Sequence, residues 1–327
     1  VFTKPVILIG VRVGEDYVSN GNYTILPVIY QIGALYKFFP DWKENYNVLV
    51  FSDDEEYAKL NFDCRENIYF ATGIDAEQMC LGTLCTHFII PNSTFSWWQA
   101  YLGQKENSVV VHPHTYFKGE LAKTHSTKDF WEKNWMEYKW EKLNLSDLSI
   151  TIPVSYDHPH REENFNLITS WLHSNFNVNI MVGEQGGEKL HYAGRPGIKF
   201  YTYFYEMNNF HRTKMLNYLA KNSTTPYIAN YDADNLISVM QMMLSIDELR
   251  NGEEMVYPYD GRSARVGRDK WLSVLQKSNG DIGKLKGEIF RGTRAIDPES
   301  VGHIIMWNKE KYFNIGGENE NFISYGP

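Results

Sequence analysis

The chain has 327 residues, of which 43% are apolar and 22% are charged, and its formal net charge at pH 7 is −8. These values are typical of folded globular domains and exclude an intrinsically disordered chain. Neither half has the excess of basic residues that binding to nucleic-acid phosphates requires, which excludes nucleic acid as a partner. No apolar run approaches the roughly 20 residues of a membrane span, so we expect at most peripheral association with a membrane.

The cysteine content predicts a reduced protein. Cys64, Cys80 and Cys85 are odd in number and lie in one half of the chain, so they form no disulfide framework. They are expected to be buried thiols, and a cytoplasmic location follows. Aromatic residues make up 15% of the chain, either as core side chains or as surfaces on which sugar rings stack.

The length predicts two domains, because one hydrophobic core seldom organises this many residues. In the first half, strand-like apolar runs alternate with helical patterns at residues 26–39 and 75–84; the runs lie at residues 6–11, 48–51, 87–90 and 109–111. This alternation predicts a doubly wound parallel sheet. An amphipathic helix is expected over residues 130–145, with the domain joint near residues 145–149, which gives domains 1–147 and 148–327.

A second alternation begins with apolar runs at residues 149–153, 178–182 and 227–231. In an open α/β sheet, ligands bind beyond the carboxyl ends of the strands, and Asp232 and Asp234 directly follow the last of these runs. Two carboxylates separated by one residue can bind a divalent cation, which would neutralise the diphosphate of a nucleotide sugar. Taken alone, the pair is also compatible with two ordinary surface aspartates.

The residues around this pair resemble a known family. The stretch FHRTKMLN at residues 210–217 is similar to the Phe-x-Arg-x-Lys-x-Leu-Asn segment that precedes the metal motif of β-1,4-galactosyltransferases. Residues 152–161, 183–185, 256–261 and 314–317 resemble further segments of that family in the same order. The resemblance covers residues 150–327 and extends to the glycosyltransferases of family two.

This resemblance implies a GT-A fold, a donor site that binds a UDP-sugar with Mn²⁺ or a similar divalent cation, and transfer of a galactose-like hexose with inversion. Asp232 and Asp234 would bind the metal. A solvated helix face is the alternative for Arg212 and Lys214. The implied donor-binding residues are Arg161, Gln185, Arg212, Lys214, Asp232, Asp234 and Asp260.

Inverting transfer requires a carboxylate that takes the proton of the attacking hydroxyl group. In the family this base belongs to a Gly-Gly-Glu-Asp segment, and the matching position begins at residues 325–327, where the sequence ends. We therefore expect the base to lie beyond Pro327, with the second half truncated before it. Glu318 and Glu320 are the substitute catalytic candidates, and acceptor-loop residues are their alternative role.

The first half carries the most distinctive string of the chain, HFIIPNSTFSWWQAYL at residues 87–102. It resembles the Ser-Thr-Phe-Ser-Trp-Trp motif of bacterial α-1,2-fucosyltransferases, which form glycosyltransferase family eleven. A strand followed by a helix start would present backbone N–H groups to a phosphate. The alternative is a helix rich in aromatic residues and capped by Ser93 or Thr94.

Two further segments support the resemblance. Residues 51–54 match a Phe-Ser-Asp-Asp segment, and residues 11–18 resemble a His-x-Arg-Arg-Gly-Asp-Tyr motif that binds GDP-fucose. Gly10 replaces the His, Val13 replaces the second Arg and Glu15 is inserted, so weaker donor binding is expected. The implied donor-binding residues, which need no metal, are Arg12, Asp16, Ser52, Asp53, Asp54, Ser93, Thr94 and Phe95.

The sequence therefore predicts an α/β protein with a Rossmann-like parallel-sheet domain, half of a GT-B fold truncated at its N-terminus, followed by a GT-A domain. The leading hypothesis is a bifunctional enzyme that transfers sugars from a UDP-sugar and GDP-fucose to a glycan or glycolipid acceptor during surface-polysaccharide synthesis. The alternative is a single transferase whose first half serves as a binding or docking module.

Overall fold

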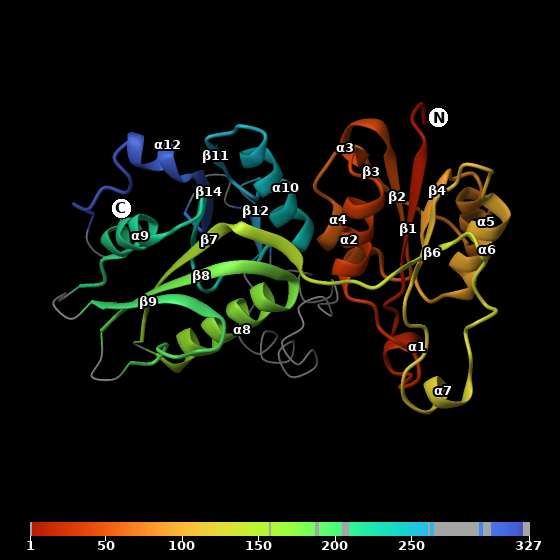
Figure 1. Cartoon of the computed structure of the whole chain (residues 1–327), viewed down its shortest axis with the longest axis horizontal. Helices are drawn as coiled ribbons and strands as arrows, with labels where there is room; N and C mark the ends of the chain where they lie inside the picture. The colour runs from red at the N-terminus through yellow and green to blue at the C-terminus, as the bar shows by residue number, and fades with distance from the viewer. Residues whose placement is uncertain are drawn as a thin grey trace. The chain divides into compact units, whose positions relative to one another are not determined.

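The computed structural model describes residues 2–156, 158–186, 190–204, 209–260, 262–264, 294–296 and 302–322. The chain divides into two compact units, of which the first is Val1–Glu141 and the second comprises the described residues from Lys142 onward (Figure 1). Residues 145–149, where the sequence places the domain joint, lie inside the first strand of the second unit.

The first unit is built on one six-stranded sheet. Its strand order is β3-β2-β1-β4-β5-β6, and every neighbouring pair is parallel. This is the strand order of a doubly wound Rossmann sheet, as the sequence predicts. The elements are β1 (Val6–Val11), α1 (Glu15–Val18), α2 (Val28–Phe38), α3 (Trp42–Asn45), β2 (Asn47–Ser52), α4 (Glu55–Phe62), β3 (Ile68–Phe70), α5 (Asp75–Thr83), β4 (His87–Ile89), α6 (Thr94–Gly103), β5 (Val110–Pro113), α7 (Gly119–Thr124) and β6 (Met136–Tyr138).

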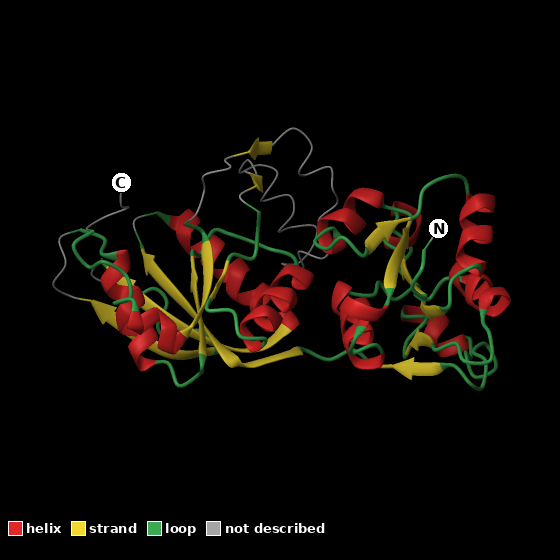
Figure 2. Cartoon of the chain, turned by 90° about the horizontal axis from the view of Figure 1, so that it is seen from above, coloured by secondary structure: helices red, strands yellow, loops and turns green. Residues whose placement is uncertain are grey.

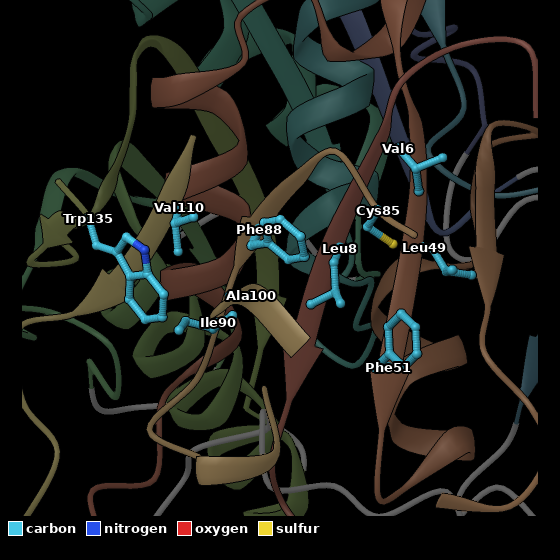
Figure 3. Packing of buried hydrophobic residues seen from close by; sticks show 10 residues of the cluster. All are labelled: Val6, Leu8, Leu49, Phe51, Cys85, Phe88, Ile90, Ala100, Val110 and Trp135. Carbon is cyan, nitrogen blue, oxygen red and sulfur yellow. The ribbon is translucent and has the colours of Figure 1, made fainter. Parts of the chain in front are cut away.

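Helices cover both faces of this sheet. Figure 1 shows α2, α3 and α4 on one side of the strands and α5 and α6 on the other. All six residues of β1 are buried, as expected for a parallel strand packed on both faces. Leu8, Leu49, Phe88 and Val110 come from four strands and pack with Ala100 of α6 in one cluster (Figure 3). This core fixes the strand ends at which the candidate site residues lie.

The prediction of an amphipathic helix over residues 130–145 is wrong. The span instead contains β6, which pairs in parallel with β5, and the start of the next strand. The Trp135 indole donates to Gln104 Oε1 at 2.9 Å, and the Trp97 indole donates to the Phe130 carbonyl at 2.9 Å. Trp135 and Tyr138 are thus buried from a turn and from the short strand that follows it, and not from a helix.

The cysteines only partly follow the prediction. Cys85 is buried and Cys64 is half-buried, but Cys80 is exposed. Burial raises the pKa of the Cys64 and Cys85 thiols to about 12. These two cysteines therefore act as apolar packing groups at neutral pH.

The second unit contains a mixed six-stranded sheet of order β11-β14-β10-β7-β8-β9. The four strands from β10 to β9 are parallel, whereas β14 is antiparallel to β10 and to β11. Figure 2 shows this sheet in yellow with its helices in red. The elements are β7 (Leu143–Ser155), α8 (Pro159–Asn175), β8 (Phe176–Gln185), β9 (Ile198–Phe204), α9 (Arg212–Asn222), β10 (Tyr227–Tyr231), α10 (Val239–Arg250), β11 (Met255–Val256), β14 (Ile304–Asn308), α12 (Lys309–Asn314) and the separate pair β12 (Arg262–Ala264) and β13 (Arg294–Ile296).

The strands expected at residues 149–153, 178–182 and 227–231 are confirmed as parts of β7, β8 and β10. Helices α8 and α9 both pack against β7 and β8. Within the residues described, no helix has both the length and the apolar character that crossing a membrane requires.

Gly10 lies in β1, between β2 and β4, at a very tight contact. A Cβ atom at this position would lie 2.3 Å from Pro91 Cδ and 3.1 Å from Ser96 Oγ. The proline ring cannot rotate away, so any side chain at position 10 forces the strand or the following loop to move. The histidine of the fucosyltransferase motif therefore has no room here.

We expect Gly10→Ala to destabilise the protein by about 1–3 kcal/mol, the usual cost of overpacking a tight core. Gly21→Ala is the matched control, because a Cβ atom there meets no atom within 4 Å. Both substitutions restrict the unfolded chain to the same degree, so their difference in urea unfolding isolates the contact with Pro91. Equal unfolding midpoints for the two variants would show that β1 accommodates a side chain at position 10.

Candidate functional site

Each sheet has one position at which the chain changes direction along the strand order. In the first unit it lies between β1 and β4, and in the second it lies between β7 and β10. Ligands of open α/β sheets bind at such a switch point, beyond the carboxyl ends of the strands. Arg12 and Asp16 follow β1, and Asp232 and Asp234 follow β10, so the topology places these candidates where a ligand site is expected.

Asp232 and Arg212 form the centre of the candidate site in the second unit. Arg212, the first residue of α9, donates a hydrogen bond from Nε to Asp232 Oδ1 at 3.0 Å, and its Nη2 lies 2.9 Å from the same oxygen in an ion pair. Its Nη2 also donates to the Gly302 carbonyl at 3.1 Å. The Asp232 backbone N–H donates to the His303 carbonyl at 3.0 Å. Arg212 is therefore part of a defined ion pair and not of a solvated helix face.

The two aspartates have different surroundings. Burial raises the pKa of the Asp232 carboxyl group; Arg212 opposes this shift, and the negative charge of Asp234 adds to it. Asp234 is exposed, and its Oδ1 accepts a hydrogen bond from Asn235 Nδ2 at 2.9 Å. One carboxylate is thus held by a cation, whereas the other faces solvent.

This pair fits only one kind of metal site. Across the part of the chain that the structure describes, no three His, Cys, Asp or Glu side chains are grouped closely enough to hold a metal ion. Two carboxylates suit a hard divalent cation that takes its other ligands from water and from substrate phosphates. Asp232 and Asp234 therefore fit a metal that binds together with a diphosphate.

Gln185 positions the start of α9. It lies buried at the end of β8, where its Nε2 donates to the Asn209 carbonyl at 2.6 Å and its Oε1 accepts from the His211 N–H at 2.8 Å. His211 is the N-cap of α9 and directly precedes Arg212. This predicted donor residue thus holds the backbone from which Arg212 reaches Asp232.

The other predicted donor residues of this unit lie on three elements. Arg161 is in the first turn of α8, Lys214 is exposed on α9, and Asp260 is exposed in the segment after β11. Residues 325–327, beyond which the family base is expected, lie outside the described residues.

Glu318 is tied to the strand that leads into Asp232. Its Oε1 accepts from Asn230 Nδ2 at 2.8 Å, and Asn230 is fully buried in β10. Asn230 Oδ1 in turn accepts from the Thr151 hydroxyl group at 3.0 Å. One carboxylate oxygen of Glu318 is thus engaged by Asn230, which favours the alternative role of Glu318 as an acceptor-loop residue.

Asn217 of α9 holds the turn that contains Glu318. Its Oδ1 accepts from the Glu318 N–H at 2.8 Å and from the Tyr312 hydroxyl group at 2.6 Å. Its Nδ2 donates to the Glu318 carbonyl and to Glu320 Oε1, both at 2.9 Å. All four hydrogen-bonding positions of the carboxamide are therefore used.

The close approach of this turn to Asn217 requires glycine. Gly317 has a φ of 70°, and a Cβ atom there would lie 2.6 Å from Asn217 Oδ1. Neither Asn217 nor Asn230 is among the site residues that the sequence predicts. A polar residue inside the apolar run of β10 was a usable signal for Asn230, because buried polar groups in a strand need a specific partner.

In the first unit, Asp53 organises the loop that follows β1. Its Oδ1 accepts from the Val13 N–H at 2.8 Å, and its Oδ2 accepts from the Gly14 N–H at 2.7 Å and from Arg12 Nη1 at 2.6 Å. Arg12 Nη2 also donates to Asp16 at 2.6 Å. The structure thus brings together three predicted donor residues, but it joins them to one another.

Tyr17 bridges the switch point of the first unit. It is 7% exposed, and its hydroxyl group donates to the Asn92 carbonyl at 2.7 Å. Asn92 Nδ2 donates to the carbonyls of Thr24 and Tyr116, both at 2.8 Å. Tyr23 stacks on Tyr17 with ring centroids 4.7 Å apart. Side chains of the protein therefore link the loops that follow β1, β4 and β5.

The remaining candidates of the first unit divide into two groups. The Ser52 hydroxyl group accepts from the Asp54 N–H at 3.0 Å, and Asp54 Oδ1 caps α4 by accepting from the Tyr57 N–H at 2.9 Å. These two residues hold a turn. Ser93 is the N-cap of α6 without a side-chain cap bond, Thr94 is exposed and Phe95 is half-buried.

The Asn217 contacts predict a local effect on the turn. We expect Asn217→Ala to lower the free energy of unfolding by about 1–3 kcal/mol, because buried partners lose their hydrogen bonds. Amide hydrogen exchange should accelerate in peptides that contain Glu318. The control is Asn222→Ala on the same helix, whose Nδ2 makes one exposed bond to the Tyr218 carbonyl. Unchanged exchange at Glu318 in the Asn217 variant would contradict the assignment.

Comparisons with known proteins concern mainly the first unit. Residues 3–139 match the family described as Glycosyl transferase family 11. The O-antigen biosynthesis glycosyltransferase WbnK of Escherichia coli is 33% identical over 124 residues, which are 36% of this chain and 40% of that protein. An alpha-1,2-colitosyltransferase of Escherichia coli is 30% identical over 114 residues, 32% of this chain and 39% of that protein.

The chain thus spans about two fifths of the length of these curated relatives. Among solved structures, the 4-diphosphocytidyl-2C-methyl-D-erythritol synthase of Anaerococcus prevotii DSM 20548 covers 53% of this chain and 74% of its own. Its sequence identity is 10% and its TM-score is 0.28, which is too low to indicate a common fold. The resemblance of residues 150–327 to GT-A enzymes stays a prediction. The match to glycosyl transferase family 11 is confined to residues 3–139, which lie in the first unit.

Proposed function

We propose that this chain is a glycosyltransferase of surface-glycan synthesis, and that its second unit transfers a galactose-like hexose from a UDP-sugar to a glycan or glycolipid acceptor. The observation that carries the proposal is the cluster of Arg212, Asp232 and Asp234 at the switch point between β7 and β10. It combines carboxylates for a divalent cation with a guanidinium group for a diphosphate. The relatives of the first unit, which include an O-antigen glycosyltransferase, support a glycan as acceptor.

The residues of the cluster would divide the work of donor binding. Asp232 and Asp234 would hold Mn²⁺ or a similar cation, which supplies positive charge for the departing nucleoside diphosphate. Arg212 lies beside them and would contact the diphosphate oxygens. Gln185 keeps the start of α9 in place, so that the guanidinium group stays within reach of the strand end.

The acceptor side of the proposed site begins at the turn held by Asn217. Inverting transfer needs a carboxylate beside the acceptor hydroxyl group, and Glu318 and Glu320 are the candidates among the described residues. Glu320 is exposed and makes its contact with Asn217, whereas the Glu318 carboxylate is held by Asn230. Of the two candidates within the chain, Glu320 is therefore the more accessible to an acceptor.

For the first unit, transfer of fucose from GDP-fucose is one candidate function, and a docking or binding module is the other. The docking role is favoured because Arg12 is already paired with Asp16 and Asp53. In addition, Val13 stands where the family has its second Arg, and it is only 7% exposed. A missing charge-assisted phosphate contact weakens binding by about 1.5–3 kcal/mol, which is roughly a ten- to hundredfold loss.

We expect UDP to bind the full chain in the presence of Mn²⁺ and to bind at least about tenfold more weakly in EDTA. Asp234→Asn should cause a similar loss in Mn²⁺, because it removes the exposed carboxylate of the pair. Asp147→Asn is the matched control, since it removes the same charge from a residue that pairs with Arg250 near the start of β7. Equal UDP affinities in Mn²⁺ and in EDTA, measured by calorimetry, would refute the metal site.

Thermal-shift titrations distinguish the two roles of the first unit. A ligand raises the unfolding temperature only if it binds the folded protein. If the first unit has a docking role, millimolar GDP-fucose should leave the unfolding temperature unchanged. UDP-galactose with Mn²⁺ should raise the unfolding temperature. Saturable stabilisation by GDP-fucose, or transfer of fucose to a galactoside at an ordinary enzyme rate, would establish instead that Arg12 suffices for donor binding.

A further inference from the structure

In the ion pair at the end of β10, the positively charged guanidinium group of Arg212 lies against the Asp232 carboxylate, which is also a ligand of the proposed metal site. Arg212 Nε donates a hydrogen bond to Asp232 Oδ1 at 3.0 Å, and Nη2 lies 2.9 Å from the same oxygen in an ion pair. The side chains of Arg212 and Asp232 are only 21% and 29% exposed, so water screens this pair poorly. Without a ligand, the Asp232 charge is already largely balanced.

A divalent cation that binds alone meets two obstacles at this site. It competes with the guanidinium group for Asp232 Oδ1, and it is repelled by the positive charge that remains beside it. In the described part of the chain, the site offers no third His, Cys, Asp or Glu side chain that would compensate. The metal by itself is therefore expected to bind weakly.

A nucleoside diphosphate reverses both effects. Its oxygens supply ligands to the metal, as is usual for hard cations held by one or two carboxylates. The same oxygens offer the guanidinium group a new charge-assisted partner once it leaves Asp232. The Arg212 contact to the Gly302 carbonyl and the Gln185 contacts to the preceding loop keep the arginine at the site during this exchange.

We propose that Arg212 couples the binding of the divalent cation to that of the nucleoside diphosphate: it pairs with Asp232 while the site is empty and exchanges this partner for the diphosphate when the metal arrives. This inference rests on the proposed function of the second unit. Because such coupling is reciprocal, each ligand raises the affinity for the other by the same factor. The exchange favours joint binding of metal and diphosphate and disfavours the metal alone.

The test is calorimetry on the full chain with MnCl₂ alone, with UDP in EDTA and with UDP in MnCl₂. For the unaltered protein we expect weak binding of Mn²⁺ alone and a coupling factor of at least about ten. In Arg212→Gln, the affinity for Mn²⁺ alone should rise severalfold, and the affinity for UDP in Mn²⁺ should fall about ten- to a hundredfold. The coupling factor should therefore shrink.

Two further variants complete the experiment. Arg250→Gln removes the same charge from another Arg–Asp pair of the second unit, that with Asp147, and it should leave all three affinities unchanged. Arg212→Lys keeps the charge but loses the planar guanidinium group, which contacts Asp232 from Nε and the Gly302 carbonyl from Nη2, so its coupling factor should be intermediate. It also serves as the test variant if Arg212→Gln fails to fold.

The outcomes separate the two claims. If the unaltered protein binds UDP equally well with and without Mn²⁺, the proposed function itself is wrong. If UDP binding depends on Mn²⁺ but the Arg212 variants keep the affinity for Mn²⁺ alone and the full coupling factor, the function stands and the role of Arg212 is overturned.

Discussion

The contact between Arg212 and Asp232 is the interaction on which the candidate site depends. It joins the start of α9 to the end of β10, which both lie at the edge of the sheet where the parallel strands end. Two neighbouring groups of hydrogen bonds hold the segments around this ion pair in place. Gln185 fixes the backbone before Arg212, and Asn217 fixes the turn at Glu318 against the same helix. A carboxylate at a strand end thus becomes part of a site because polar side chains secure each segment around it.

The two units show how a similar set of charges leads to different chemistry. In the first, one arginine faces two carboxylates, and the Asp53 oxygens also accept two backbone N–H groups, so that carboxylate is fully used in holding a loop. In the second, Asp234 remains exposed next to the paired Asp232. A divalent cation can reverse the net charge of the second cluster and so attract a diphosphate. In the first, both carboxylates already pair with Arg12, although the Asp16 side chain remains 71% exposed, and this pairing agrees with the proposed docking role of the first unit.

The strands and the Asp232–Asp234 pair were predictable from the sequence because they depend on local patterns. The sequence of a buried parallel strand is a continuous run of apolar residues, and a carboxylate that follows such a run lies at the end of the strand. Residues 130–145 were mispredicted because mixed aromatic and charged residues are compatible with an amphipathic helix and with an extended segment at a sheet edge. The contacts of Asn217 and Asn230 with Glu318 could not be predicted, because Glu318 is 101 and 88 residues away from them in the sequence. Such pairing is decided by the tertiary fold and leaves no local pattern.

In the proposed site of the second unit, Asp232, Asp234 and Arg212 bind a divalent cation and a nucleoside diphosphate as one coupled pair. The most direct measurement is electron paramagnetic resonance of Mn²⁺ with the full chain, because bound Mn²⁺ loses the sharp signal of the free ion. We expect the sharp Mn²⁺ signal to persist with protein alone and to fall when UDP is added. With ¹⁷O-labelled UDP, direct coordination by the phosphate oxygens should broaden the signal of the bound ion further. A signal that is lost equally without UDP, or that matches a protein-free solution of Mn²⁺ and UDP, would contradict this coupled binding.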